Sequence, residues 1–500
     1  MLATDVETAD GVVRGRRAPR AVQWRSIPYA AAPVGELRLR APQPVQPWAG
    51  VRDATRFGCA AVQRRNPMVA LRRTGEDCLT LNVTAPPDPS ARSRRPVLVF
   101  LHGGGYLFDT AARYPGDSLA ARGDVVVVTL NYRLGALGYV DFTEFSTADR
   151  PFESNLGLRD QVAALRWVRR NIAAFGGDPD NVTLFGESSG ADAVLTLMAT
   201  PAAAGLFHRA IAQSPAADWA AVDAEAARRF ARRLLGRFLG RLGVAPDSAA
   251  RALTTAAAKD LCRAAEQALR EVVRAFPGSY PIAPVVDGAF LPQDPLDVIT
   301  TGSAQAVPLI VGTNRDECAL SRFDATVPTT APALRAALQR CGADHERVAT
   351  AYPGYPKRAA AVRLSTDFVL WRPAQAVLEG HSGRAPTFSY RFDFAPRALR
   401  LAGLGAVHGI ELLPVFGGVD SMPVRLLTLA GGRQGFRAVQ REVQDNWLAF
   451  ARTGRPLASW PAYTAAQRNT RIIDHPSRTE VDPQREHRLL WEGVRVPAAG

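Results

Sequence analysis

The sequence has few of the residues that would indicate a metal centre or a disulfide-stapled fold. Its 500 residues include five cysteines and seven histidines, and neither a C-x-x-C pair nor an H-E-x-x-H pair occurs. The cysteines form an odd, scattered set, so their spacing implies neither a zinc site nor a disulfide framework. We therefore expect no metal and no cofactor.

Long hydrophobic runs are also missing. The longest, "VLVF" and "VVVV", have the length of strands and are far shorter than the roughly 20 residues that cross a bilayer. The first residues, "MLATDVETADGVV", lack the basic and then apolar pattern of an export signal. We expect no membrane span and a cytoplasmic protein, although secretion is not excluded.

Lysine is nearly absent, yet the chain is strongly basic. The net charge is +14 and the isoelectric point is about 10.2, and Lys259 and Lys357 are the only lysines. A basic surface attracts polyanions, but here the arginines form no concentrated tract. We expect an arginine-rich solvated surface and no nucleic-acid partner, with a polyanion or an acidic lipid as the alternative.

The pattern of apolar residues indicates an α/β protein. Buried strands are predicted at "RRPVLVFLH", "GDVVVVTLNYR", "NVTLFGES", "HRAIAQS", "VPLIVGTN" and "PTFSYRFDF". A helix is predicted at "GLRDQVAALRWVRRNIAAFGG", and strands that alternate with helices give a large, mostly parallel sheet covered on both faces. The polar opening stretch favours an antiparallel ribbon at the sheet edge. We expect a single domain over 1–500, with helical insertions at about 220–280 and 330–385 that cap the site.

A possible nucleophile lies in "VTLFGESSGAD", at 182–192. Gly186-Glu187-Ser188-Ser189-Gly190 matches G-x-S-x-G, and it lies between a predicted strand and a predicted helix, as a nucleophile elbow requires. In this frame Ser188 is the attacking hydroxyl and Ser189 offers its backbone N–H. The motif alone is weak evidence, because five-residue matches of this kind occur by chance.

A second motif precedes it. "FLHGGGYLFD" places Gly103, Gly104 and Gly105 after a strand, where backbone N–H groups can face an anion. A flexible turn or a phosphate loop is the alternative, but the Lys-Ser/Thr of a P-loop and the G-x-G-x-x-G spacing are both absent. In this order the two motifs point to an α/β-hydrolase, in which an acid and then a histidine follow along the chain.

Spacing does not select the acid and the base. The downstream histidines are His345, His381, His408, His475 and His487; His408 lies between glycines, and His381 is the next candidate. Asp316 and Glu317 both follow a strand end, where such folds present catalytic groups.

The chain resembles the type B carboxylesterases, the family of para-nitrobenzyl esterases and cholinesterases, over nearly its whole length. The shared motifs include "EDCLTLNV", "HGGGY", "NYRLGALGY", "FGESSGA", "GTNRDE" and "HGIEL". The resemblance implies that Ser188 is the nucleophile, Glu317 the acid and His408 the general base. It further implies that Gly104, Gly105 and Ser189 are the oxyanion-hole donors, and that Cys59 and Cys78 are paired in a disulfide, which a reducing cytoplasm would oppose.

The implied activity is that of a serine carboxylesterase (a carboxylic ester hydrolase, EC 3.1.1) acting on small to medium esters through an acyl-enzyme on Ser188. Carbamate or amide hydrolysis, lipase activity and a non-catalytic interaction role are the alternatives. The partner is then a small-molecule ester, and the sequence does not choose between monomer and dimer.

The sequence departs from the family pattern at four positions. Ser189 replaces an alanine, Cys318 replaces a glycine that follows the acid, and Pro215 and Pro414 stand in segments that border the acyl pocket. The candidates for the pocket wall are aromatic, although most aromatic residues of this kind belong to the core: Tyr106, Phe108, Trp219 and Phe416.

Overall fold

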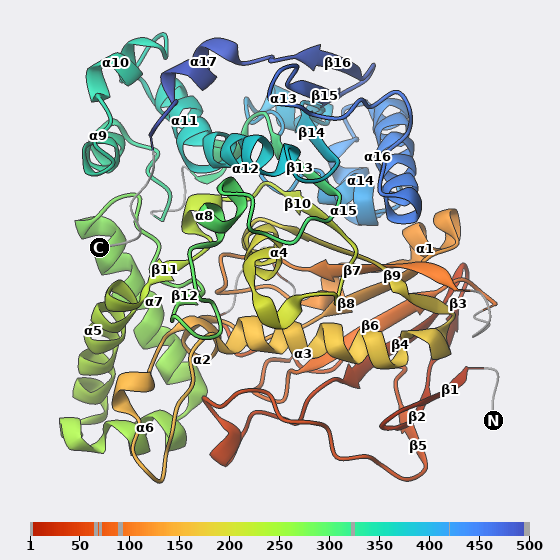
Figure 1. Ribbon diagram of the computed structural model, residues 1–500, viewed down its shortest axis with the longest axis vertical. Helices are drawn as coiled ribbons and strands as arrows, with labels where there is room; N and C mark the ends of the chain where they lie inside the picture. Colours follow the sequence, from red (N-terminus) through yellow and green to blue (C-terminus); the bar gives the residue numbers. More distant parts are fainter. Residues whose placement is uncertain are drawn as a thin grey trace.

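An eleven-stranded sheet organises the computed structural model, which describes residues 4–64, 69, 73–88, 94–321, 326–419 and 421–494 (Figure 1). The strand order is β16-β15-β14-β13-β10-β9-β7-β8-β6-β4-β3. In chain order the strands are β3 (Arg16–Ala18), β4 (Ala21–Pro28), β6 (Thr80–Ala85), β7 (Arg95–Leu101), β8 (Val126–Leu130), β9 (Gly177–Glu187), β10 (Arg209–Gln213), β13 (Leu309–Asn314), β14 (Thr387–Phe392), β15 (Asn469–Ile473) and β16 (Arg478–Val481).

The middle of the sheet is parallel and both of its edges are antiparallel. Strands β8, β7, β9, β10, β13, β14 and β15 pair in parallel. The pairs β15–β16, β8–β6, β6–β4 and β4–β3 are antiparallel. The six buried strands predicted from the sequence correspond to β7, β8, β9, β10, β13 and β14, so the mostly parallel sheet is confirmed.

The ribbon predicted for the start of the chain divides between two sheets. The hairpin β3–β4 forms the antiparallel edge of the large sheet. The first hairpin, β1 (Asp5–Thr8) with β2 (Gly11–Arg14), instead joins β5 (Val51–Asp53) in a separate three-stranded sheet. The expectation of a single ribbon at the edge was therefore only partly right.

Helices cover both faces of the large sheet, and the alternation of side chains along a strand shows how. On β7, Val97, Val99 and Leu101 face a core shared with α3 (Leu156–Asn171), α4 (Ser189–Ala199) and α12 (Arg372–Ser382). Leu98 and Phe100 face the opposite core, shared with α1 (Asp117–Gly123), α14 (Leu412–Phe416) and α16 (Arg433–Thr453). A strand buried on both sides has to be apolar throughout, which explains the continuous hydrophobic runs in the sequence.

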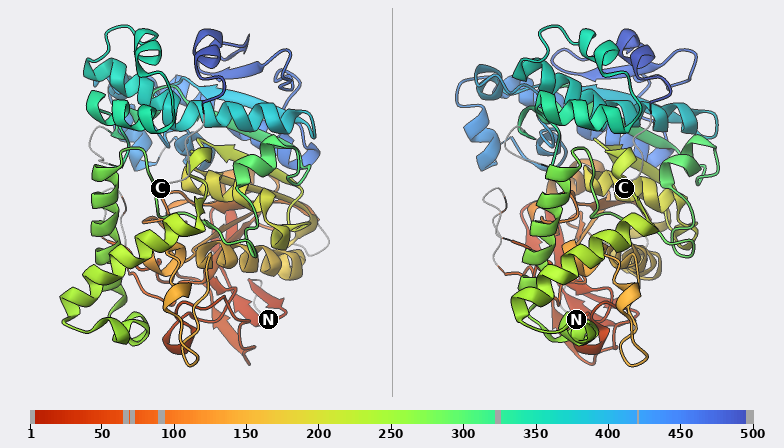
Figure 2. Two further views of the ribbon diagram at one scale, coloured as in Figure 1. Left: turned by 60° about the vertical axis from the view of Figure 1, so that its left-hand side comes forward. Right: turned by 90° about the vertical axis from the view of Figure 1, so that its left-hand side faces the viewer.

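The two stretches predicted as helical insertions are helical. The first contains α5 (Ala224–Leu242), α6 (Ala249–Thr255) and α7 (Ala258–Ala275), and α5 and α7 pack side by side beyond the sheet (Figures 1 and 2). The second contains α9 (Ala331–Arg340), α10 (His345–Thr350), α11 (Arg358–Thr366), a π-helical turn at Asp367–Trp371 and then α12. That these helices cap the site stays a prediction.

The remaining elements are short. They are α2 (Gly135–Tyr139), β11 (Val222–Asp223), β12 (Val285–Val286), α8 (Pro295–Thr300), α13 (Arg397–Leu401), α15 (Met422–Leu427) and α17 (Arg485–Leu490). Within the described residues, the search for a helix with the length and apolar character of a membrane span found none.

Candidate active site

Ser188 occupies a strained turn between strand β9 and helix α4. It follows the last strand residue, Glu187, and caps the helix that begins at Ser189. Its backbone dihedrals are φ 57° and ψ −130°, in a region that residues with a side chain rarely adopt. The turn leaves the side chain only half-buried, so the hydroxyl of Ser188 remains accessible.

The two glycines of the motif are required by close packing. A Cβ atom on Gly186 would lie 2.3 Å from the carbonyl oxygen of Gly190. A Cβ atom on Gly190 would lie 2.1 Å from the carbonyl oxygen of Leu101, at the end of β7. The serine turn therefore rests directly on the strand that leads into the triple glycine.

The triple-glycine loop packs against the serine turn. Gly104 and Gly105 have φ values of 103° and 60°, which favour glycine, and both are partly exposed. In the part of the chain that the structure describes, the backbone N–H groups of Gly104, Gly105 and Ser189 donate to no hydrogen-bond acceptor. The Ser189 hydroxyl accepts the N–H of Tyr106 at 3.2 Å, so the side chain of Ser189 joins the two motifs.

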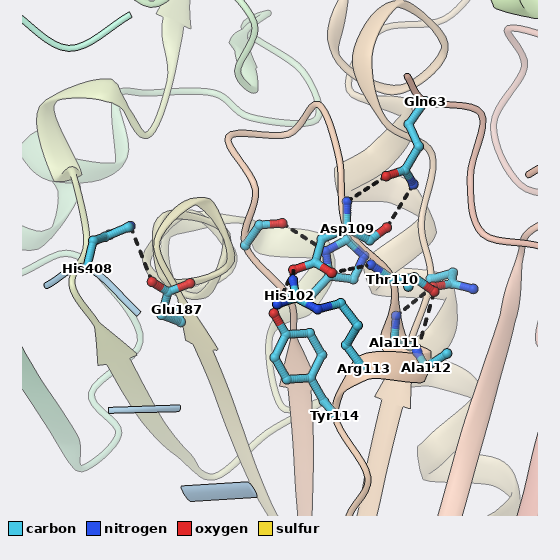
Figure 3. Close-up of polar contacts among 12 residues, drawn as sticks. Gln63, His102, Asp109, Thr110, Ala111, Ala112, Arg113, Tyr114, Glu187 and His408 are labelled. Carbon is cyan, nitrogen blue, oxygen red and sulfur yellow. Dashed lines mark hydrogen bonds and ion pairs between the residues drawn. The ribbon is translucent and has the colours of Figure 1, made fainter. Parts of the chain in front are cut away.

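The far end of the same loop is held by Asp109 (Figure 3). Its carboxylate accepts hydrogen bonds from the Thr110 N–H at 2.7 Å, from the Tyr114 hydroxyl at 2.6 Å and from the Arg113 guanidinium at 2.8 Å. Its own N–H donates to the Gln63 side chain at 2.8 Å. The segment that contains the glycines is thus fixed at both ends.

His408 and Glu317 are brought together from separate loops. Glu317 follows the end of β13, His408 lies in the loop between α13 and α14, and the His408 Nδ1 lies 2.6 Å from the Glu317 Oε2. Glu317 is fully buried, and its other oxygen accepts the N–H of Asn314 at 2.6 Å. A buried carboxylate at Nδ1 fixes the tautomer of the imidazole and leaves Nε2 available for proton transfer.

The second imidazole nitrogen faces Glu187, the residue directly before Ser188 (Figure 3). The His408 Nε2 lies 3.2 Å from the Glu187 Oε1. Among the contacts of the described residues, none joins the Ser188 hydroxyl to His408. Burial raises the pKa of Glu187 to about 8. Burial alone would lower the pKa of His408, but the charges of Glu187 and Glu317 outweigh it and raise that pKa to about 10, so the groups titrate together.

Sequence reasoning missed a third buried carboxyl group in this cluster. Asn314 donates from its side chain to the Glu411 Oε2 at 2.6 Å and to the Val407 carbonyl oxygen at 3.1 Å. Burial raises the pKa of Glu411 to about 7. Glu411 lies in the "HGIEL" motif and Glu187 in "FGESSGA", so both had a signal in the sequence, but nothing there assigned them a neighbour.

The structure separates the alternatives that the spacing left open. Asp316 points away from His408: it accepts the Ala406 N–H at 2.9 Å and pairs with Arg315 at 3.2 Å. His381 is buried in the last turn of α12, where its Nε2 contacts the Val307 carbonyl oxygen at 2.8 Å. Neither residue contacts the cluster around Ser188.

Trp219 and Phe108 lie beside the glycine loop. The Trp219 ring stacks on Tyr280 with a centroid distance of 5.7 Å, and the Tyr280 hydroxyl donates to the Gly105 carbonyl oxygen. Phe108 is partly exposed, and a Cβ atom on Gly104 would touch its ring at 3.2 Å. These two of the four proposed wall residues therefore border the loop that carries the free N–H groups.

The other two aromatic candidates belong to the core. The Tyr106 ring is 1% exposed and packs on Tyr139 with a centroid distance of 4.2 Å. Phe416 lies among Phe100, Tyr114 and Phe185, in the core on the α14 and α16 side of the sheet. The structure thus favours the alternative given above, that Tyr106 and Phe416 are core residues, over a place in the pocket wall.

Asp192, one helical turn after Ser188, was not anticipated either. It is buried, and burial raises its pKa to about 8, although the nearby backbone N–H of Ala216 opposes that rise. Ala216 belongs to the segment that leads from Pro215 to Trp219. The carboxyl group thus lies where the helix of the elbow contacts this segment.

The cysteines are separate thiols in the structure. Cys59 and Cys78 are free, so a disulfide between them stays a prediction. Cys318 is buried, and its backbone φ is not positive, so the backbone at this position does not require a glycine. Burial raises the pKa of its thiol to about 12, which disfavours the reactive thiolate. Among the described residues, no group of three or more possible metal ligands occurs.

Comparison with known proteins identifies the family. The model of the carboxylesterase family matches residues 3–491. The chain belongs to the carboxylesterase family. It is 38% identical to the para-nitrobenzyl esterase of Bacillus subtilis over 97% of each chain, and 32% identical to human carboxylesterase 5A over 88% of this chain and 80% of that one. It is a carboxylic ester hydrolase.

Solved structures of esterases share the fold. A para-nitrobenzyl esterase superposes with a TM-score of 0.86 at 37% identity, covering 98% of this chain and 99% of the other. A carboxylesterase of Geobacillus stearothermophilus superposes with a TM-score of 0.84 at 34% identity, covering 98% and 100%. The esterase therefore has the α/β-hydrolase fold that the order of its motifs predicts.

Proposed function

We propose that the chain is a serine carboxylesterase that hydrolyses small to medium carboxylic esters through an acyl-enzyme on Ser188, with His408 as general base and Glu317 as the acid that orients it. The observation that carries the proposal is the 2.6 Å contact between the His408 Nδ1 and the buried Glu317, beside the strained turn of Ser188.

In the first half of the reaction the Ser188 hydroxyl attacks the ester carbonyl carbon. His408 takes the hydroxyl proton on Nε2, and the carbonyl oxygen becomes an oxyanion. When the tetrahedral intermediate collapses, the bond to the alcohol breaks and His408 gives its proton to the leaving oxygen. Glu317 stabilises the imidazolium that exists between these two transfers.

The oxyanion requires donors that are in place before the reaction begins. The N–H groups of Gly104, Gly105 and Ser189 suit this role, because they have no partner within the described chain and lie where the loop packs on the serine turn. Loss of one such donor typically lowers kcat by about 100- to 1,000-fold. The anchoring of the loop by Asp109 supports the proposal, since a fixed donor needs no reorganisation during the reaction.

In the second half a water molecule replaces the alcohol. His408 removes a proton from the water as it attacks the acyl carbon. When the second intermediate collapses, the bond to the Ser188 oxygen breaks, His408 returns the proton to that oxygen, and the carboxylic acid is released with Ser188 as the free hydroxyl. In both halves Nε2 must leave Glu187 and face the reacting oxygen. Catalytic hydrogen bonds of this kind often tighten only when substrate is bound.

The aromatic side chains beside the glycine loop support a proposal for the substrate class. Trp219 and Phe108 border the glycine loop and favour an apolar acyl group or an aromatic alcohol. We propose these two residues as the main pocket contacts, and a screen of p-nitrophenyl esters with increasing acyl length as the measurement of preference. p-Nitrobenzyl esters belong in the same screen, because a relative is named for them.

A covalent probe tests the mechanism. A fluorophosphonate should label the wild-type chain once, and Ser188→Ala should abolish both the labelling and ester hydrolysis. Ser214→Ala, which removes a buried hydroxyl at the end of the neighbouring strand, serves as the control that retains labelling. A folded wild-type protein that is neither labelled nor active on any ester would overturn the proposal and would favour a non-catalytic role.

A further inference from the structure

A surface formed by α13, α15 and the turn after α15 carries the most exposed large hydrophobic side chains of the described chain. Leu429, Met422 and Leu401 are 79%, 73% and 72% exposed, and Leu426 is 54% exposed. We call this region, residues 397–403 and 421–430, the α13–α15 surface. The two helices contact each other, so these side chains belong to one region rather than to scattered positions.

The exposure of these side chains is imposed by packing beneath them. Val424, on the inner side of α15, is completely buried in the core that includes Val415 and Phe436. The backbone of Gly432 approaches Arg397 at the start of α13. With the inner side of α15 fixed in this way, Met422 and Leu426 on the same short helix have to face solvent.

The described charged side chains of this surface are all basic. Arg397, Arg400 and Arg425 are exposed, as is Arg437 on α16. Among the described residues from 397 to 441, the only acidic one is the buried Glu411; Asp420 lies outside the described residues. Asp316, which packs against the loop at Ala406, is paired with Arg315.

We propose that the α13–α15 surface docks the esterase on an anionic lipid surface. Exposed leucine and methionine side chains surrounded by arginines match the two layers of such a surface, because the apolar groups enter the acyl region while the guanidinium groups contact the phosphates. In the right-hand view of Figure 2, short helices in the blue of this region stand out from the edge of the molecule. A projecting surface inserts into a lipid layer more readily than it encloses a peptide.

The same features argue against self-association through this surface. A two-fold dimer would bring the arginines of both copies together, and the described residues of this surface include no exposed carboxylate to neutralise them. The loop that carries His408 runs from α13 to α14, so docking here would place the loop of the proposed base close to the lipid. The docking itself does not depend on the proposed catalytic mechanism.

Vesicle sedimentation tests the proposal with the full chain. We expect binding to phosphatidylcholine vesicles that contain phosphatidylglycerol, and no binding to vesicles of phosphatidylcholine alone. The triple variant Met422→Ser/Leu426→Ser/Leu429→Ser should lose about tenfold or more of the partition coefficient, since three apolar side chains no longer enter the lipid. A matched triple variant, Leu242→Ser/Val244→Ser/Leu457→Ser, removes exposed apolar groups elsewhere and should bind within about twofold of wild type.

The charges are tested in the same way. Arg400→Gln/Arg425→Gln should weaken binding more than Arg228→Gln/Arg229→Gln on α5, although both variants remove the same charge. Thermal unfolding checks that all variants are folded. Absence of wild-type binding, or equal loss in the matched variants, would overturn the proposal in favour of diffuse electrostatic attraction. Retention on immobilised poly-glutamate that requires Met422, Leu426 and Leu429, without vesicle binding, would overturn it in favour of an acidic protein.

Discussion

At the scale of single residues, each nitrogen of the His408 imidazole contacts a carboxylate, and one of them, Nε2, is also the proposed site of proton transfer. Nδ1 is held by Glu317, whereas Nε2 faces Glu187 rather than Ser188. A negative charge on Glu187 stabilises the protonated imidazole, and the protonated imidazole cannot act as a base. If His408 is the base, as proposed, the charge of Glu187 contributes to the pH above which the enzyme is active.

Replacing Glu187 by glutamine should move the acid limb of the pH dependence of kcat/KM to lower pH. The charge of Glu187 raises the pKa of His408, so its removal lowers that pKa, and the neutral base is then present at lower pH. Glu411→Gln is the matched control: it removes another buried carboxyl group of the cluster whose charge raises the pKa of His408 less, and it should give a smaller shift. An acid limb that stays in place or moves to higher pH in Glu187→Gln would contradict this interpretation.

The hydroxyl of Ser189 should contribute to the rate through the glycine loop. In Ser189→Ala the Tyr106 N–H loses its acceptor, and a net loss of about 1 kcal/mol at this contact corresponds to a fall in kcat of about fivefold, with KM little changed. Thr196→Val, which removes a buried hydroxyl farther along the same helix, should change stability and leave kcat nearly unaltered. A Ser189→Ala enzyme with the kcat of wild type would show that the hydroxyl is merely tolerated.

At the scale of elements, the end of β7 and the start of α4 are in contact through Gly190. Gly190→Ala places a Cβ atom 2.1 Å from the Leu101 carbonyl oxygen, so either the turn or the strand end must move. We expect at least about a 100-fold loss of kcat/KM, since misplacement by about an ångström costs that much. Gly236→Ala, on α5 where the added atom meets nothing within 4 Å, should keep full activity and gain slightly in stability. Activity assays normalised to circular dichroism check both variants, and full activity in Gly190→Ala would contradict the geometry.

The elements of the parallel sheet could be predicted from the sequence, whereas those at its edges could not. Strands β7, β8 and β13 each contain a continuous apolar run because helices cover both faces, and such runs are easily recognised. By contrast β16, which is mostly exposed, reads "RTEV" and looks like a loop. The separate sheet of β1, β2 and β5 depends on a pairing across about 40 residues, which no local pattern specifies.

The same contrast applies to the candidate site. Ser188 could be nominated because its motif lies between a predicted strand and a predicted helix, whereas Glu317 and His408 were assigned only through the resemblance to a family, since five histidines and two acids fitted the spacing. The contact between His408 and Glu187 depends on how two loops about 220 residues apart meet, and no spacing encodes that. Phe416 was nominated as a wall residue although it packs beneath the sheet, because an aromatic residue in a motif does not show which side of its element it occupies.

At the scale of the whole molecule, one buried ion pair joins three distant parts of the chain. Arg133, after β8, donates to both oxygens of Asp160 on α3 at 2.7 and 2.8 Å, and its remaining nitrogen donates to the Arg40 carbonyl oxygen at 2.7 Å. Both side chains are almost completely buried. Such a pair is costly to break, because the remaining charge has no solvent.

Asp160→Ala should therefore lower the free energy of unfolding by about 3–5 kcal/mol. Asp445→Ala, which breaks the exposed pair with Arg122, should cost less than about 1 kcal/mol. Denaturant unfolding followed by tryptophan fluorescence measures both. Equal losses in the two variants would show that burial of the Arg133–Asp160 pair is not what makes it important.

The contact of Gly190 with the carbonyl oxygen of Leu101 also bears on how this esterase can change over evolution or by design. The serine turn packs directly on the end of β7 that leads into the glycine loop, and we call this contact the seam. An added Cβ atom at Gly190 would clash there, so neither the turn nor the loop can be altered alone without disturbing the other. New substrate preferences then have to come from outside the seam, at Trp219, Phe108 and the segment after Pro215. Libraries aimed at these positions should yield active variants more often than libraries aimed at the motifs themselves.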